Sequence, residues 1–159
     1  MSRLKGRRGM ALALVVAALG GALATATPRT ATAQVAGGCS NATLNGSYGY
    51  QASGAAFIGP DGVPQVGGAR VDFAATGRVV FDGRGGFTFA ETASIGGMVL
   101  PRGGNGTYTT QADCTGTATA SFASGEVNEL AVVIVHGGEE FYFMTTNPGT
   151  TLFATAKKQ

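Results

Sequence analysis

The chain of 159 residues is long enough for one domain with a modest hydrophobic core. Its 27 glycines, its 13% of charged residues and its lack of tryptophan favour a turn-rich all-β protein over a helical one. Beyond residue 33 the chain carries six basic and nine acidic residues, a net charge of −3 that argues against nucleic acid as a partner.

The first 33 residues have the three parts of an export signal. A basic start precedes an apolar run over residues 10–19, and Ala31-Thr32-Ala33 fits the small-residue pattern before a cleavage site. Because the apolar run is too short to span a bilayer, we expect no transmembrane segment. We predict a signal peptide cleaved after Ala33 and a secreted or periplasmic protein. The pair Arg7-Arg8 leaves both Sec and twin-arginine export open.

Cys39 and Cys114 are the two cysteines of the chain. In an exported protein such a pair is typical of a disulfide. The alternatives are a zinc site and a catalytic thiol, but a structural zinc ion needs four ligands and His136 is the single histidine. A lipoprotein anchor at Cys39 is disfavoured because this residue lies well beyond the apolar run. We predict a Cys39–Cys114 disulfide, no bound metal and no cofactor.

Apolar and polar residues alternate with a period of two almost everywhere after residue 44, as in β-strands. The alternation is clearest over residues 69–82, where it continues through Gly77 and predicts one long strand with a bend. Strong turn formers such as Asp82-Gly83-Arg84-Gly85 separate the strands. We predict eight strands, over residues 46–57, 69–82, 87–95, 105–112, 115–123, 128–136, 139–146 and 150–157.

Tight turns make strands that are neighbours in sequence antiparallel neighbours in space. Eight such strands with one apolar face close into an up-and-down barrel, which removes both edges of the sheet. We therefore predict an all-β domain over residues 46–159, an eight-stranded antiparallel up-and-down barrel, preceded by a segment over residues 34–45 that carries Cys39. A two-sheet β-sandwich is the alternative.

Three segments carry a resemblance: CSNATLNGSYGY over residues 39–50, GRVVFDGRG over 77–85, and GTY leading into DCTG over 106–116. They resemble a group of small exported bacterial β-proteins of uncharacterised function, over nearly the whole mature chain. The resemblance implies a lipocalin-like meander barrel and supplies no catalytic residues. Tyr48 takes the place of the tryptophan that true lipocalins have on their first strand.

Glu91 is the polar residue whose position in the sequence points most clearly to a functional site. It shares its strand phase with Phe87, Phe89 and Ile95, so an unbroken strand points its carboxylate into the apolar interior. A buried carboxylate without a partner has a raised pKa, and such groups cluster at functional sites. The alternative is a bulge near Glu91 or a position at the barrel rim. His136 is the other catalytic candidate, although its place before Gly-Gly favours a rim residue over a general base.

An eight-stranded barrel either leaves room for one small ligand or is filled by its own side chains. We predict that the aromatic interior binds a small apolar ligand. The alternatives are a structural or interaction protein with a filled core, and a cofactor-free isomerase or cyclase that uses Glu91, which rests on fold analogy alone. The expected ligand-contacting residues are Tyr48, Tyr50, Phe73, Phe81, Phe87, Phe89 and Glu91.

Residues 130–135 and 141–144 are apolar on both strand faces. Because neighbours in a strand point to opposite faces, one set lines the barrel and the other lies outside. Contiguous exposed apolar patches usually mark partner contacts, so we predict a homo-oligomer through these strands or cover by the chain's own loop. The two sets are Leu130, Val132, Ile134, Phe141 and Phe143, and Val133, Val135, Tyr142 and Met144.

Overall fold

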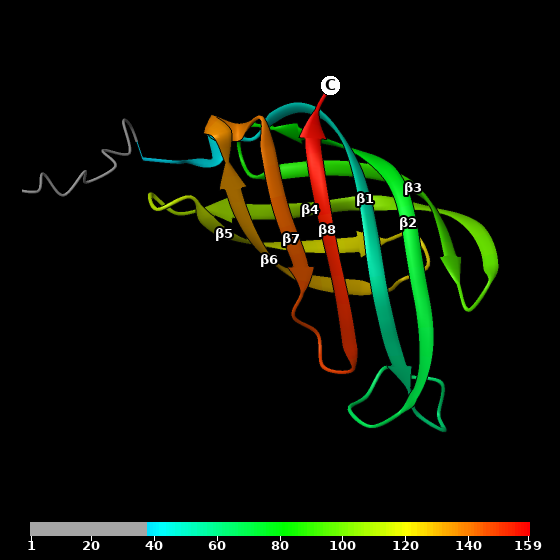
Figure 1. Cartoon of the computed structure of the whole chain (residues 1–159). Coiled ribbons are helices and arrows are strands. Elements are labelled where there is room, and N and C mark those ends of the chain that lie inside the picture. Colours follow the sequence, from blue (N-terminus) through cyan, green and yellow to red (C-terminus); the bar gives the residue numbers. More distant parts are fainter. Residues whose placement is uncertain (1–37) are drawn as a thin grey trace, which may run out of the picture. The chain divides into compact units, whose positions relative to one another are not determined.

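The computed structural model describes residues 38–159, which form a closed barrel of eight antiparallel strands in the order β1 to β8 (Figure 1). The predicted up-and-down barrel is therefore confirmed, and the sandwich alternative is wrong. The expected signal peptide and its cleavage site after Ala33 lie outside the described residues. The strands are β1 (Asn45–Ile58), β2 (Ala69–Asp82), β3 (Gly86–Ile95), β4 (Met98–Thr110), β5 (Thr115–Phe122), β6 (Val127–Val135), β7 (Glu140–Thr145) and β8 (Thr150–Lys158).

Seven strands lie within two residues of their predicted bounds, but the prediction for β4 is wrong. It starts at Met98 rather than at residue 105, because a tight turn at Gly96-Gly97 lets it pair with the whole of β3. Pro101 and the glycines that follow it have low strand propensity, and pairing overrides that preference. Two short 3-10 helices complete the fold, η1 (Asn41–Thr43) and η2 (His136–Gly138). No helix within residues 38–159 is long and apolar enough to cross a membrane.

Aromatic rings fill the end of the barrel near η1. Tyr48 is fully buried, and its ring meets those of Phe81 and Phe141 edge-on, at centroid distances of 5.6 and 5.3 Å. Phe81 also meets the ring of Tyr108 edge-on at 5.0 Å. Edge-to-face pairs at such distances add about 0.5–1.5 kcal/mol each to the gain from burial. This end of the barrel is therefore a packed core.

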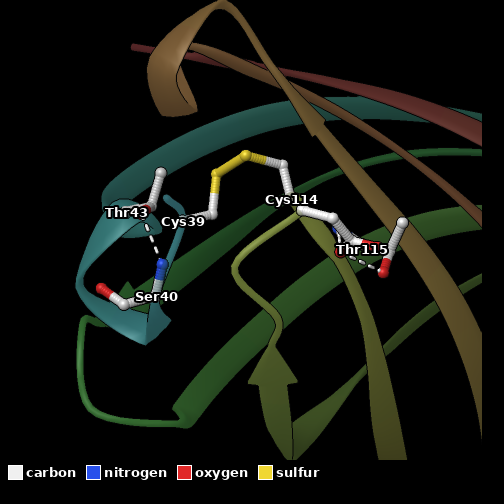
Figure 2. The surroundings of a disulfide bond; sticks show 6 residues. Cys39, Ser40, Thr43, Cys114 and Thr115 are labelled. Carbon is white, nitrogen blue, oxygen red and sulfur yellow. Dashed lines mark hydrogen bonds between the residues drawn. A yellow bond between two sulfur atoms is a disulfide. The ribbon is translucent and has the colours of Figure 1, made fainter. Parts of the chain in front are cut away.

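The predicted disulfide between Cys39 and Cys114 is confirmed, with a sequence separation of 75 residues (Figure 2). It joins the segment before β1 to the turn between β4 and β5. We call this end of the barrel the disulfide end and the opposite end the far end. β5 lies four strands from β1 in either direction around the closed sheet, so the N-terminal segment crosses the disulfide end from one wall to the other.

Hydrogen bonds hold the N-terminal segment in place across the disulfide end. The hydroxyl of Tyr108 lies 2.8 Å from the carbonyl oxygen of Asn41 and 2.9 Å from that of Leu44. The Asn41 side chain accepts a hydrogen bond from the backbone N–H of Thr110 at 2.8 Å. Leu44 is 1% exposed, because η1 turns it inward over the aromatic core. The segment thus closes this end of the barrel.

The turn between β2 and β3 is built around Asp82. Its Oδ1 accepts hydrogen bonds from the backbone N–H groups of Arg84, Gly85 and Gly86, at 2.7, 3.0 and 2.9 Å. These bonds hold the pKa of the Asp82 carboxyl below its ordinary value. The Asp-Gly-x-Gly pattern of the sequence is therefore a turn with an internal acceptor.

Gly77 lies opposite Glu91 in the register of β2 and β3, at the position where the sequence predicts a bend. A Cβ atom on Gly77 would lie 2.5 Å from the carbonyl oxygen of Ala90 and 2.8 Å from the Cβ of Glu91. Both distances are shorter than non-bonded contacts allow. A glycine at this position lets β2 approach β3 closely beside Glu91.

The outer faces of β6, β7 and β8 carry an apolar strip formed by Val133, Tyr142, Met144 and Phe153. Val133, Met144 and Phe153 are 47%, 50% and 57% exposed, and the rings of Tyr142 and Phe153 stack at 6.4 Å. In the other of the two predicted sets, Val132, Ile134 and Phe141 are buried inside the barrel. The loop expected as a cover was predicted over residues 54–67. In the structure the β1–β2 loop spans residues 59–68, lies against Gly149 at the far end and leaves the strip exposed.

We predict that the double substitution Cys39→Ala/Cys114→Ala lowers the free energy of unfolding by about 4–5 kcal/mol, because the bridge restricts a loop of 75 residues in the unfolded chain. Urea unfolding of the variant and of the oxidised wild type measures the difference. Thiol titration of the folded wild type is the control and should detect no thiol. Two titratable thiols in protein recovered from an oxidising compartment would contradict the prediction.

We expect Gly77→Ala to lower the free energy of unfolding by about 1–3 kcal/mol, because its methyl group overlaps the backbone of β3. Arg78→Ala is the matched control: it changes the next residue, which is exposed, and should alter stability by less than about 0.5 kcal/mol. Equal urea midpoints for the two variants would show that β2 can move away from β3 at no cost.

Candidate functional site

A cavity of about 90 Å³ lies inside the barrel, between the aromatic core of the disulfide end and the far end. Its walls are mainly aromatic and aliphatic, and a few polar side chains reach it. Side chains from most of the strands contribute, because each strand turns alternate residues inward. The aromatic lining residues include Tyr50, Phe73, Phe81, Phe87, Phe89, Tyr108, Phe122, Phe141 and Phe143.

Six of the seven residues expected to contact a ligand line this cavity; Tyr48 does not. Strand phase placed Tyr48 correctly inside the barrel, but the residue lies deeper, in the core of the disulfide end. Its hydroxyl donates a hydrogen bond to the carbonyl oxygen of Gly138 at 2.6 Å. Phe81 and Phe141 occupy the space beside its ring. Tyr48 therefore belongs to the packed core and not to the wall of this cavity.

Glu91 projects into the barrel interior, and its side chain is 5% exposed. The strand register is unbroken on both sides, with Gly77 opposite on β2 and Arg102 opposite on β4. The alternatives of a bulge and of a rim position are therefore wrong. The carboxylate is also not isolated: the hydroxyl of Tyr50 donates a hydrogen bond to Oε2 at 2.7 Å.

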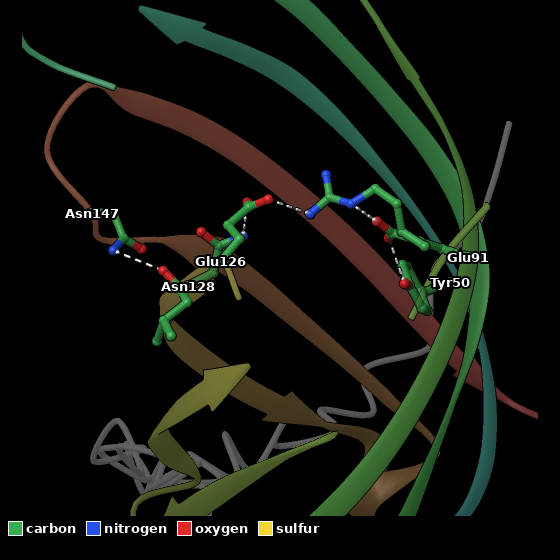
Figure 3. A network of polar contacts seen from close by, with 7 residues as sticks. Tyr50, Glu91, Glu126, Asn128 and Asn147 are labelled. Atoms are coloured by element: carbon green, nitrogen blue, oxygen red, sulfur yellow. Dashed lines mark hydrogen bonds and ion pairs between the residues drawn. The ribbon is translucent and has the colours of Figure 1, made fainter. Parts of the chain in front are cut away.

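Arg102 completes the polar group of the cavity, and the sequence analysis missed it. Its Nε lies 3.5 Å from Oε1 of Glu91, and its Nη2 lies 3.0 Å from Oε2 of Glu126. The guanidinium also lies over the ring of Phe122, 4.0 Å from the ring centroid. In Figure 3 the dashed lines run from Tyr50 through Glu91 and on to Glu126.

A signal for Arg102 was present in the sequence. The residue shares its phase with Tyr108, so a strand extended toward the N-terminus from Tyr108 points Arg102 into the barrel. A strand that begins at residue 105, as the sequence predicts, places Arg102 in a loop. Glu126 gives no such signal, because it lies in the turn between β5 and β6.

The Tyr50 hydroxyl remains a hydrogen-bond donor over the whole physiological pH range. Burial, together with the hydrogen bond to Glu91 and the negative charge of that residue, raises the pKa of Tyr50 well above its ordinary value near 10. Arg102 acts in the opposite direction with a smaller effect. Oε2 of Glu91 is thus permanently occupied as an acceptor by a neutral tyrosine.

His136 lies away from this group. It begins η2 at the disulfide end, its side chain is 73% exposed, and its Nδ1 lies 3.6 Å from Oε2 of Glu140. Of the two catalytic candidates, only Glu91 reaches the cavity. In the described part of the chain no three His, Cys, Asp or Glu side chains lie close enough together to bind a metal ion.

No known protein family matches this chain, and no curated protein matches it. Among solved structures, the chain is similar to a redesigned β-barrel that is 16% identical in sequence. The similarity covers 75% of this chain and 94% of the redesigned barrel, with a TM-score of 0.48.

Proposed function

We propose that this protein is an exported binding protein that holds a small apolar ligand inside its barrel. The observation that carries the proposal is the cavity of about 90 Å³, which the inward aromatic side chains leave unfilled. Protein interiors are packed as densely as organic crystals, and voids larger than a water molecule are few. An apolar void beside a few convergent polar groups is the arrangement typical of small-molecule sites, although this one is smaller than most of them.

The size of the cavity limits what it can hold. An apolar protein cavity of about 150 Å³ holds benzene. The cavity here is smaller, so it suits a short chain or one end of a ring compound, with the remainder directed toward the far end. A large lipid or a haem does not fit without rearrangement of the walls.

Two observations support the exported location. The Cys39–Cys114 disulfide is of the kind that persists in oxidising compartments. The first 33 residues have the pattern of an export signal. We propose that the protein binds its ligand outside the cytoplasm.

Toluene is a suitable apolar probe, and we expect it to shift the backbone amide NMR signals of cavity-lining residues in the wild type. Ala120→Leu places three additional carbon atoms in the cavity and should abolish these shifts. Ala90→Leu, on the exposed outer face of β3, is the matched control and should retain them. If Ala120→Leu does not fold, the smaller change Ala118→Val should weaken binding instead. Absence of toluene binding to the folded wild type would contradict the proposal.

The exposed apolar strip favours a second candidate function, assembly into a homo-oligomer. Val133 pairs with Tyr142 and Met144 pairs with Phe153 across the strands, so the four side chains form one continuous surface. Continuous apolar surfaces on soluble proteins usually mark interaction sites. We propose that a second copy of the chain covers this strip.

We predict that Val133→Lys/Met144→Lys converts an oligomer into a monomer in sedimentation velocity experiments, because two charges cannot be buried in an apolar contact. Val80→Lys is the control, since Val80 is 38% exposed on β2, outside the strip. Both variants should keep the wild-type melting temperature to within a few degrees. A wild-type protein that stays monomeric at millimolar concentration would refute the assembly.

A further inference from the structure

We propose that the ligand of the barrel carries a neutral hydrogen-bond donor, a hydroxyl or an N–H group, which binds to Oε1 of Glu91. This inference rests on the proposed function, and it identifies the chemical class of the ligand. The starting observation is that Oε1 of Glu91 is buried and accepts no hydrogen bond from any of residues 38–159.

The neighbours of Glu91 do not satisfy this oxygen. The Tyr50 hydroxyl is bonded to the other oxygen, Oε2. The Arg102 Nε lies 3.5 Å from Oε1, near enough for an ion pair but without the geometry of a hydrogen bond. Buried acceptors are almost always hydrogen-bonded in folded proteins, and an unsatisfied one is costly. A donor is therefore missing at Oε1.

The missing donor has to come from the cavity. Glu91, Tyr50 and Arg102 all line it, and most of the remaining wall is hydrocarbon. Among the other polar side chains that line the cavity, Thr145 bonds to Thr150 and Asn128 bonds to Glu126, and none donates a hydrogen bond to Oε1. A molecule that fills the cavity is thus the group positioned to donate to Oε1.

The charges around the cavity favour a neutral donor. Arg102 lies between the carboxylates of Glu91 and Glu126, so its positive charge is already compensated and the three groups together carry one excess negative charge. An anionic ligand would face that excess negative charge. An ammonium group would be attracted by that charge, but it would lose its hydration in a cavity whose wall is mostly hydrocarbon, and the desolvation of a charged group costs far more than that of a hydroxyl or N–H group. A neutral hydroxyl or N–H group meets neither obstacle.

Phenol and toluene test the inference, because they have the same number of non-hydrogen atoms and differ in one hydroxyl group. We expect phenol to bind the wild-type protein about tenfold more tightly than toluene, since a hydrogen bond to a charged acceptor outweighs the cost of dehydrating the hydroxyl group. Benzoate and benzylammonium should both bind more weakly than phenol. Kd values come from NMR titrations of the full chain.

Glu91→Gln should reduce the preference for phenol over toluene to about twofold or less, because the amide is an uncharged and weaker acceptor. Glu129→Gln is the matched control on the outer face of β6, where Glu129 contacts Thr119, and it should leave the preference unchanged. If Glu91→Gln does not fold, the same two Kd values are measured for Tyr50→Phe. This substitution frees Oε2 of Glu91 as a second acceptor, so the preference for phenol over toluene should rise. A preference that does not rise overturns the inference.

The outcomes separate this inference from the proposed function. If neither phenol nor toluene binds, the proposed function fails. If toluene binds and phenol binds no more tightly, the barrel is a binding protein but a water molecule satisfies Oε1, and the inference is overturned. A phenol preference that persists in Glu91→Gln also overturns it, because the donor then binds elsewhere.

Discussion

Pairing of β1 with β8 closes the sheet, and everything inside the barrel depends on it. Nine consecutive residue pairs, from Tyr48–Lys158 to Ala56–Thr150, form this seam. The seam leaves no free edge and gives every inward side chain partners from the opposite wall. The β1 residue Tyr50 can meet Glu91 of β3 because both project into one enclosed space. An open sheet with the same sequence would expose the carboxylate to water.

The three motif segments, over residues 39–50, 77–85 and 106–116, have a structural explanation. Cys39 forms the disulfide, Leu44 covers the core, Asp82 organises a turn, and Tyr108 anchors the N-terminal segment. All four lie at the disulfide end or in the segment that closes it. The polar group of the cavity includes one motif residue, Tyr50, whereas Glu91, Arg102 and Glu126 lie outside the motif segments. The motif segments therefore specify mainly how the barrel is closed, and most of the polar group of the cavity lies outside them.

The fold could be predicted from the sequence because alternation and turn residues are local signals. The phase of Glu91 was sufficient to place its carboxylate inside the barrel. The depth of a residue along the barrel axis depends on the stagger between strands, so strand phase alone did not show that Tyr48 lies in the core of the disulfide end and not at the cavity. Arg102 was missed because Pro101 and the two glycines after Arg102 have low strand propensity, so the sequence does not predict a strand there. Its bond to Glu126 depends on a turn conformation that no periodic pattern encodes.

The disulfide also bears on the order in which the chain folds. Tyr48 and Lys158, at one end of the β1–β8 seam, are far apart in the sequence, and contacts of that kind slow folding. Once Cys39 is linked to Cys114, the covalent path between these two residues is roughly half as long. Halving a flexible loop reduces its closure entropy by about 0.6 kcal/mol. Early oxidation therefore favours closure of the seam, and the barrel is expected to fold faster in an oxidising compartment than in a reducing one.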